Sequence, residues 1–254
     1  MNSPLLQLDK VTIRFGGLTA VSAVDLLIGA NELIGLIGPN GAGKTTVFNL
    51  ITGVYQATEG KITFSGQPTP GLKPHELTKL GIARTFQNIR LFASMSVFDN
   101  VRTAAALHHS HGVRSALWRG PTFREGEQTI EKQVMELLDI FDLGKFREEP
   151  AKCMPYGSQR RLEIVRALAT KPKLLLLDEP AAGMNPTEKI ELTRLIRFIK
   201  DKFQIAVLLV EHDMQVVMGI CERIAVLDYG VKIAEGTPAE VRANPKVIEA
   251  YLGD

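Results

Sequence analysis

The sequence predicts an α/β fold that combines a mostly parallel central sheet, an inserted helical region and an N-terminal antiparallel sheet. A short apolar run at 33–37 precedes a glycine-rich loop and a helical pattern, and this order is typical of a parallel α/β core. Two further apolar runs, at 174–177 and 205–210, have the length of strands buried on both faces. The region from about 90 to 155 has helical periodicity, and we expect it to be a helical subdomain inserted within a single domain, 1–254.

The N-terminal region is predicted to be antiparallel. Residues 5–28 alternate apolar and polar side chains, which is the pattern of strands with one solvated face, and Gly16-Gly17 marks a turn between them. Further strands are expected at 61–65 and at 82–86, and the second of these places Gln87 at its end.

Capping patterns mark the starts of three predicted helices. The segments 96–99, 185–188 and 237–240 each place a Ser, Asn or Thr three residues before an acidic side chain. In the second segment, Pro186 stands at the first helical position, where its missing N–H is not needed. Apolar spacing predicts buried helical faces at 130–141 and 162–169.

The composition argues against several classes of protein. Lys and Arg number 30 against 28 Asp and Glu, so no strong field favours nucleic acid or a membrane surface as a partner. The two cysteines, Cys153 and Cys221, form neither a disulfide framework nor a metal-ligand pattern. No signal peptide is visible, and no apolar run approaches the roughly 20 residues of a transmembrane helix. We therefore expect a cytoplasmic protein whose membrane role would come through a partner.

A phosphate-binding motif links the first buried strand to a helix. The pattern G-x-x-x-x-G-K-[ST] is filled by Gly38, Pro39, Asn40, Gly41, Ala42, Gly43, Lys44 and Thr45, with Thr46 following. The glycines let backbone N–H groups converge on phosphates, and the helix N-terminus adds a positive dipole end. Lys44 then contacts the β- and γ-phosphates, and the Thr45 hydroxyl ligates Mg²⁺. A plain glycine-rich turn is the alternative, but the complete motif in this context predicts binding of a nucleoside triphosphate.

Two acidic residues follow the buried run at 174–177. Asp178 lies at the strand tip beside the phosphate loop, where a carboxylate can hold the Mg²⁺ shell. Glu179 is placed to polarise an attacking water as general base. The alternative is a strand exit with two solvated acids, and the phosphate loop makes that interpretation less favoured.

Two further polar side chains follow predicted strands. His212 comes after the run at 205–210 and is expected at the carboxyl edge of the sheet, where ligands bind in open α/β folds. There it can contact the γ-phosphate and align the water with Glu179. Gln87 can offer its amide to Mg²⁺ or to the water. Neither residue alone would identify a site.

Three histidines lie close together in the segment His108-His109-Ser110-His111. Such a cluster can hold a metal, but no carboxylate or cysteine stands at ligand spacing. A solvated loop is the favoured interpretation.

The order of these motifs resembles the nucleotide-binding subunit of an ATP-binding cassette (ABC) transporter over essentially the whole chain. The matching segments are 38–46, Gln87, Tyr156–Gln159, 174–179, Ala182–Asn185 and His212. More narrowly, the chain resembles the branched-chain amino acid importer group in the segments 83–88, 178–186, 210–214 and 245–253. The stretch 108–123 is similar to the larger of that system's two ATPase subunits.

The resemblance implies a P-loop NTPase fold and an ATP hydrolase that uses ATP and Mg²⁺ to power uptake of branched-chain amino acids. It implies two transmembrane permease subunits, a solute-binding protein and a second ABC ATPase subunit, identical or different, with ATP sandwiched between the paired cassettes. It places the protein on the cytoplasmic face of the inner membrane, with no nucleic acid as partner. By the same likeness Phe15 stacks on adenine, with core packing as the alternative, and Gln87 relays between ATP and the membrane subunits.

The segment expected to contact the partner's ATP departs from the family pattern. Where the family has Leu-Ser-Gly-Gly-Gln, this chain has Met154, Pro155, Tyr156, Gly157 and Ser158. Pro155 lacks the hydroxyl of serine, while Gly157 and the following helix N-terminus still offer N–H groups. Asn185 replaces the usual Asp. We hypothesise unequal sites in a heterodimer, in which the site on this chain's own phosphate loop is the intact one.

Other functions compete with this interpretation. Similar cassettes serve uptake of urea or other amides and export of lipid or lipopolysaccharide, so the solute follows from resemblance alone. A non-transport ABC protein acting on ribosomes or DNA is less favoured, because such proteins usually carry two cassettes or a coiled-coil insert. A small-molecule kinase would need an acceptor site and a lid, and it leaves the segment 156–159 unexplained.

Overall fold

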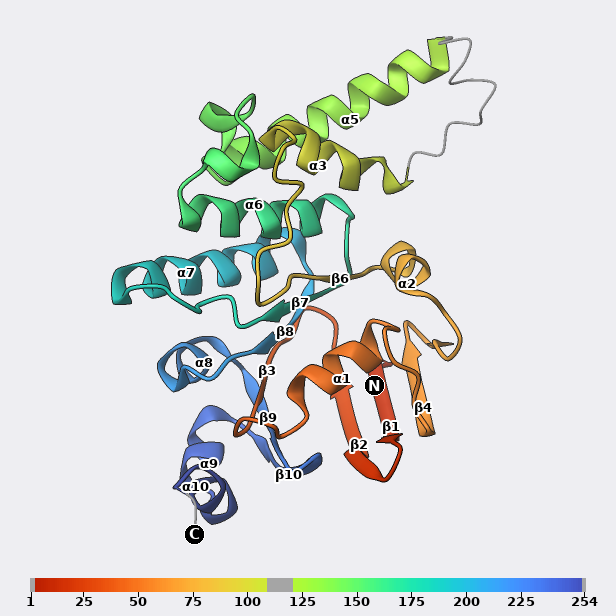
Figure 1. The fold of residues 1–254 in the computed structure, drawn as a ribbon, viewed down its shortest axis with the longest axis vertical. Coiled ribbons are helices and arrows are strands. Elements are labelled where there is room, and N and C mark those ends of the chain that lie inside the picture. Colours follow the sequence, from red (N-terminus) through yellow and green to blue (C-terminus); the bar gives the residue numbers. More distant parts are fainter. Residues whose placement is uncertain (1–2, 109–120, 253–254) are drawn as a thin grey trace. The chain divides into compact units, whose positions relative to one another are not determined.

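The structure, a computed structural model, describes residues 3–108 and 121–252 (Figure 1). The chain divides into two compact units, one of residues 1–87 with 173–254 and the other of residues 88–172. The helical insertion expected at about 90–155 falls inside the second unit. That both units belong to a single domain stays a prediction.

A six-stranded sheet forms the centre of the first unit. It consists of β3 (Leu33–Ile37), β6 (Ile82–Arg84), β7 (Leu174–Asp178), β8 (Ala206–Val210), β9 (Arg223–Asp228) and β10 (Val231–Gly236). The strand order is β10-β9-β3-β8-β7-β6, and every neighbouring pair is parallel except β9 with β10. Leu36 of β3 and Asp178 of β7 both pair with Val210 of β8, so these strands end at one edge of the sheet. The predicted α/β fold with a mostly parallel sheet is confirmed.

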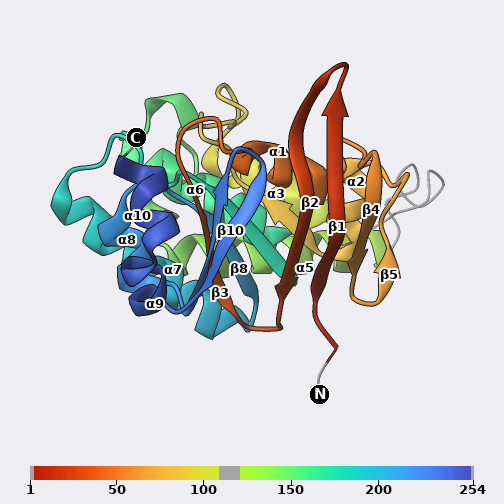
Figure 2. The same cartoon turned by 90° about the horizontal axis from the view of Figure 1, so that it is seen from below.

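A second sheet in the same unit is antiparallel (Figure 2). It consists of β1 (Leu6–Phe15), β2 (Leu18–Ile28), β4 (Glu59–Phe64) and β5 (Gln67–Pro68), in the order β2-β1-β4-β5. The turn between β1 and β2 falls at the predicted Gly16-Gly17, where Gly16 has a φ of 58°. The N-terminal antiparallel sheet is therefore present as expected, and β5 is an additional short strand.

Helices flank the strands of the first unit. They are α1 (Lys44–Ile51), α2 (Pro74–Leu80), α7 (Pro186–Phe203), α8 (Met214–Ile220), α9 (Pro238–Ala243) and α10 (Pro245–Leu252). Asn185 and Thr237 begin α7 and α9 with capping boxes, each side chain accepting the N–H three residues on, as predicted. The strand predicted at 82–86 was too long, because Arg84 is the last residue that pairs with β7.

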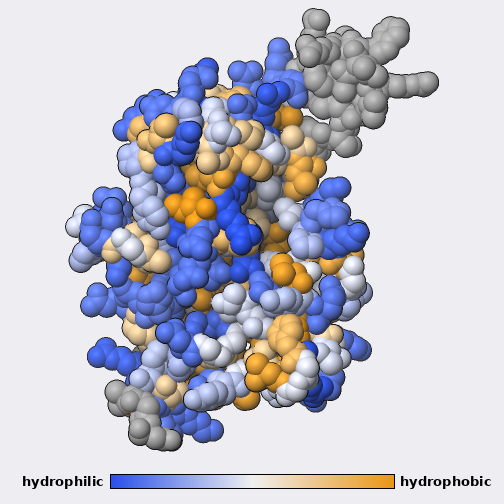
Figure 3. Space-filling view, viewed as in Figure 1, coloured by the Kyte–Doolittle hydropathy of each residue, from blue (hydrophilic) through white to orange (hydrophobic). Residues whose placement is uncertain are grey.

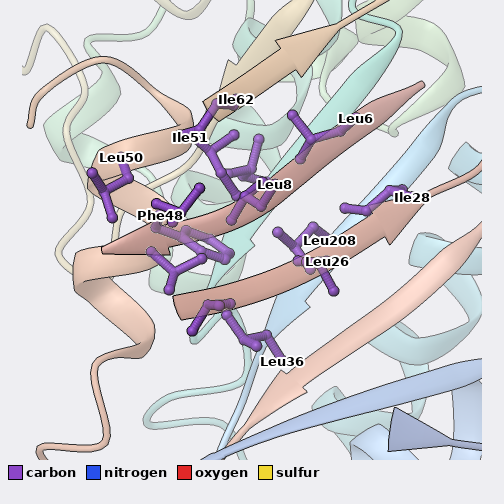
Figure 4. Close-up of a cluster of buried hydrophobic side chains, with 14 of the residues drawn as sticks. Leu6, Leu8, Leu26, Ile28, Leu36, Phe48, Leu50, Ile51, Ile62 and Leu208 are labelled. Carbon is purple, nitrogen blue, oxygen red and sulfur yellow. The ribbon is translucent and has the colours of Figure 1, made fainter. Parts of the chain in front are cut away.

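The hydrophobic core of the first unit surrounds α1 (Figure 4). Side chains of α1 pack with residues of both sheets: Phe48, Leu50 and Ile51 lie with Leu6, Leu8, Leu26 and Ile28 from the antiparallel sheet and with Leu36 and Leu208 from the parallel one. Burying a side chain of this size contributes about 1.5–3 kcal/mol. The core thus fixes the helix that begins at Lys44.

The second unit is built of helices. Among its described residues these are α3 (Val97–Ala105), η1 (Ala106–His108), α5 (Pro121–Ile140), η2 (Gly144–Phe146), η3 (Ala151–Cys153) and α6 (Tyr156–Ala169). The α3 helix contacts both α5 and α6, and Ser96 caps it by accepting the Asp99 N–H at 3.0 Å, as predicted. The predicted apolar faces are buried at Ile130, Val134, Leu138, Phe141, Leu162, Val165, Leu168 and Ala169. The histidine cluster 108–111 was interpreted as a loop; His108 instead ends η1, and residues 109–111 lie outside the described residues.

No helix within 3–108 and 121–252 is both long enough and apolar enough to cross a membrane. On the face shown in Figure 3, hydrophobic residues form separate patches between hydrophilic ones.

The position of Ile51 in the core leads to a stability prediction. Ile51 is fully buried on α1, so Ile51→Ala should leave a cavity and lower the free energy of unfolding by about 2–5 kcal/mol. Ile190 on α7 is 54% exposed, and Ile190→Ala is the matched control, with a loss below about 1 kcal/mol. Urea denaturation measures both. Equal losses would contradict this description of the core.

Candidate functional site

The loop between β3 and α1 accepts only glycine at two positions. A side chain at Gly38 would place its Cβ 2.1 Å from the carbonyl oxygen of Leu227, and one at Gly43 would lie 2.8 Å from that of Ala20. Gly43 also has a φ of 97°, a left-handed conformation that residues with a Cβ rarely adopt. The loop therefore packs backbone to backbone on β9 and β2, and this packing fixes the N–H groups at the start of α1.

Lys44 is the first residue of α1, and its side chain is buried. Its ammonium group donates to the carbonyl oxygens of Gly38, at 2.6 Å, and Pro39, at 2.8 Å. Burial lowers the pKa of Lys44, while the nearby carboxylates of Glu179 and Asp178 act in the opposite direction. The loop's own carbonyls thus hold the amine close to the two acids.

A pocket of about 420 Å³ opens beside this loop. Its lining comes from residues 40–46, from 18–20 at the start of β2, and from Glu179 and Tyr229. A pocket of this size is typical of small-molecule sites. Of the predicted loop residues, Gly38 and Pro39 do not line the pocket and act through the carbonyls that hold Lys44.

Arg84 is a site residue that the motifs did not reveal. Its guanidinium donates to the Asp178 carboxylate at 2.7 Å and to the Asn49 side-chain oxygen at 2.6 Å. It also lies over the rings of Phe48 and Phe86, 5.4 and 5.0 Å from their centroids. Both members of the Arg84–Asp178 pair are buried. The signal in the sequence was a cation inside the strand predicted at 82–86, but its partners depend on the tertiary fold.

Glu179, Gln87 and His212 come together, as the sequence predicted for strand ends at one edge. The Gln87 amide donates to Glu179 Oε2 at 2.7 Å, and His212 Nδ1 lies 3.7 Å from the same oxygen. His212 is 60% exposed. A carboxylate held by an amide and flanked by an imidazole is suited to accepting a proton from a water.

Two aromatic side chains of the first unit, Phe15 and Tyr229, are exposed. Phe15 is 45% exposed and packs edge-on against Tyr55, with 5.1 Å between ring centroids, so the core-packing alternative is wrong. Tyr229 is 89% exposed and lines the pocket. Tyr229 was not predicted as a site residue, since no motif marks it and a tyrosine in a hairpin turn is common at protein surfaces.

Comparison with known proteins decides the family. The family model described as ABC transporter matches residues 21–182, more than half of the chain. The chain belongs to the ABC transporter family. A second model, described as branched-chain amino acid ATP-binding cassette transporter, matches residues 231–254. The cassette is accordingly an ATP-binding and ATP-hydrolysing protein.

Relatives with curated names match this ABC cassette along its length. It is 43% identical over 254 residues to the high-affinity branched-chain amino acid transport ATP-binding protein BraF of Pseudomonas aeruginosa, covering 100% of both chains. It is 44% identical, again over 100% of both, to LivG of Escherichia coli K12, a protein with the same description. A probable LivG of Archaeoglobus fulgidus is 35% identical over 98% of this chain and 95% of its own.

Solved ABC cassettes share the fold. The ADP conformation of a cassette from an ABC transporter has a TM-score of 0.85 at 29% identity and covers 100% of both chains. A nucleotide-free cassette has a TM-score of 0.84 at 29% identity, covering 99% of this chain and 100% of its own. A dimeric cassette bound to ADP and Pi has a TM-score of 0.76 at 25% identity, covering 92% and 98%.

The segment predicted to contact the partner's ATP lies in the second unit, where Pro155 is the N-cap of α6. Pro155 and Tyr156 are exposed, Gly157 is half-buried, and Ser158 is buried. The Arg160 guanidinium donates to the Tyr156 hydroxyl at 3.2 Å. In the first unit, Asn185 uses its side chain to cap α7. Of the residues discussed for contact with a partner's ATP, Pro155, Tyr156 and Asn185 are therefore the exposed ones.

Glu211 is a second site-adjacent residue that sequence reasoning missed. It follows β8, is 1% exposed, and accepts the Ala181 N–H at 2.7 Å and the His212 N–H at 3.3 Å. Burial raises the pKa of Glu211, and the backbone donors and the nearby His212 only partly oppose this. A carboxyl group is thus kept in the interior directly beside His212.

The buried pair of Arg84 and Asp178 leads to a second stability prediction. Arg84→Met would leave the Asp178 carboxylate buried without its cation, which should cost about 3–5 kcal/mol of unfolding free energy at neutral pH. Arg14→Met is the control, since Arg14 pairs with Glu59 at an exposed site and its loss should cost below about 1 kcal/mol. Urea denaturation distinguishes them. Similar losses of unfolding free energy for both variants would contradict the stabilising role of the buried Arg84–Asp178 pair.

The raised pKa of Glu211 predicts a pH dependence of stability. The folded chain binds this proton more tightly than the unfolded chain, whose carboxyl titrates near 4.5. Wild type should therefore lose stability relative to Glu211→Gln as pH rises from 4.5 to the raised pKa, and the difference should stay constant above it. Melting temperatures of both proteins across pH 4–8, a range of about four units, measure this. A difference that is independent of pH would contradict the assignment.

Proposed function

We propose that this ABC cassette is the ATP-hydrolysing subunit of an importer of branched-chain amino acids. The observation that carries the proposal is the whole-chain similarity, at 43% and 44% identity, to two ATP-binding proteins named for high-affinity transport of these solutes. The match of residues 231–254 to a model of branched-chain amino acid cassettes supports the same class.

The nucleotide binds in the pocket beside the phosphate loop. The N–H groups at the start of α1 and the Lys44 ammonium meet the β- and γ-phosphates. Lys44 exchanges its bonds to the Gly38 and Pro39 carbonyls for phosphate oxygens, and the two acids nearby favour its charged form. Phe15, exposed at the end of β1, supplies an aromatic face for adenine.

The chemistry of the donor set fits Mg²⁺. The proposed ligands are the Thr45 hydroxyl, the Asp178 carboxylate and the Gln87 amide oxygen, all of them hard oxygen donors. In nucleotide sites Mg²⁺ usually takes only one or two protein carboxylates, and phosphates and waters supply the rest. When bound, the ion would neutralise negative charge on the phosphate oxygens.

Hydrolysis uses the carboxylate of Glu179, the residue after Asp178. Glu179 accepts a proton from the attacking water, and the Gln87 amide at 2.7 Å orients Glu179 Oε2. His212, 3.7 Å from the same oxygen and exposed toward solvent, contacts the γ-phosphate and keeps the water in line. Proton transfer of this kind is worth about 10²–10⁴ in rate.

The cassette works as one of a pair. Its partners are a second ABC ATPase subunit, identical or different, two transmembrane permease subunits and, indirectly, a solute-binding protein, on the cytoplasmic face of the inner membrane. The dimeric cassette with ADP and Pi supports pairing. In this arrangement the partner's ATP is contacted by Pro155, Tyr156, Gly157 and Ser158 and by the separate segment that holds Asn185.

Uptake in vesicles tests the solute. The transporter is assembled from this chain with its permease, second ATPase and solute-binding subunits, and ATP-dependent uptake of labelled leucine is measured. We expect isoleucine and valine, but not urea, to compete with leucine for uptake. Lys44→Ala should lower the rate of ATP-dependent leucine uptake by at least about a hundredfold. Competition by urea, or lipid export without leucine uptake, would assign the cassette to another solute.

A further inference from the structure

Glu179 has a backbone conformation that its surroundings must maintain. Its φ is 46°, in the left-handed region that costs a residue with a Cβ roughly 1–2 kcal/mol. Such conformations persist where neighbouring structure holds them, and they concentrate at functional sites. The direction of the Glu179 carboxylate therefore depends on what fixes the turn that follows β7.

Consecutive residues at the end of β8 hold this turn on both sides of Glu179. The Glu179 N–H donates to the Val210 carbonyl at 2.8 Å, and the Ala181 N–H donates to the Glu211 carboxylate at 2.7 Å. His212, the next residue, faces the Glu179 carboxylate itself. The segment 210–212 thus contacts the backbone of Glu179, the backbone two residues later and the Glu179 side chain.

We propose that Glu211 is a positioning residue for hydrolysis: its carboxylate holds the turn 179–181 so that Glu179 faces the Gln87 amide and His212. The inference rests on the proposed role of Glu179 as general base. Glu211 itself reaches neither nucleotide nor water, because its side chain is 1% exposed and its oxygens are directed to backbone N–H groups.

A purely structural role would be to satisfy one buried N–H group. Loss of that acceptor would then lower stability and leave kcat unchanged, whereas a positioning role also requires kcat to fall when the bond to Ala181 is lost. All of β8 is apolar and buried, so a buried carboxyl group at the residue that follows it is an exception to the local pattern. Such exceptions are expected where function requires them.

Three substitutions of Glu211 separate the roles. Glu211→Gln keeps an acceptor of the same length, Glu211→Asp keeps the charge but shortens the reach by one methylene, and Glu211→Ala removes the group. Asp213→Ala is the matched control, because Asp213 also adjoins His212 but caps α8 and pairs with Lys189, at 2.6 Å, instead of contacting the turn. Melting temperature, kcat and KM for ATP are measured for each in the assembled transporter, beside wild type and Glu179→Gln.

We expect Glu211→Asp and Glu211→Ala to lower kcat about ten- to a hundredfold with KM within about twofold of wild type, the size of effect that misplacing a catalytic group produces. Glu211→Gln should restore kcat to within about threefold, and Asp213→Ala should lose stability while keeping kcat within the same range. If Glu211→Ala does not fold, Glu211→Asp carries the test.

Two results separate the possible failures. If wild type hydrolyses ATP, Glu179→Gln does not, and Glu211→Asp keeps wild-type kcat, the positioning role is wrong and the proposed function stands. If Glu179→Gln keeps wild-type turnover, the role of Glu179 is wrong, and the inference built on it falls as well.

Discussion

The guanidinium of Arg84 joins three elements that carry the residues of the site. It extends from the end of β6, just before Gln87, to Asp178 at the tip of β7 and to Asn49 on α1, the helix that begins at Lys44. The rings of Phe48 and Phe86 cover its faces, which lowers the local dielectric and strengthens the ion pair. The position of Asp178, the carboxylate proposed to hold Mg²⁺, is thus tied to the phosphate loop on one side and to the strand leading to Gln87 on the other.

Sheet register explains why so many functional groups meet within one small volume. Leu36, Asp178 and Val210 stand at the same level in three neighbouring parallel strands. The next residues along each chain segment are then the phosphate loop, the proposed general base, and the pair of Glu211 and His212. Parallel strands end at one edge of the sheet, so a chain that alternates strand and helix returns repeatedly to the same place. Residues that are far apart in the sequence, such as Leu36 and Asp178, therefore lie close together in the site.

The sequence predicts those parts of this arrangement that have local signals. The phosphate loop, the buried parallel strands and the capping boxes each depend on residues within about five positions of one another. The pairing of Arg84 with Asp178 depends on β6 and β7 being neighbours, and the bond from Ala181 to Glu211 depends on β7 and β8 being neighbours. Strand order is not encoded by periodicity, so neither contact was accessible from the sequence. The exposure of Phe15 was equally hard to predict, because it depends on how the hairpin of β1 and β2 packs in the folded chain.

The assignment of Glu179 as general base is the claim on which the mechanism depends most. The direct test is steady-state ATPase activity of the assembled transporter with wild type or Glu179→Gln, together with binding of a fluorescent ATP analogue to both. We expect the substitution to lower turnover by at least about a hundredfold while nucleotide affinity stays within about threefold, because the phosphate loop and Lys44 are unchanged. Turnover near that of wild type would contradict both the assignment of Glu179 and the hypothesis that the site on this chain's own phosphate loop performs most of the hydrolysis.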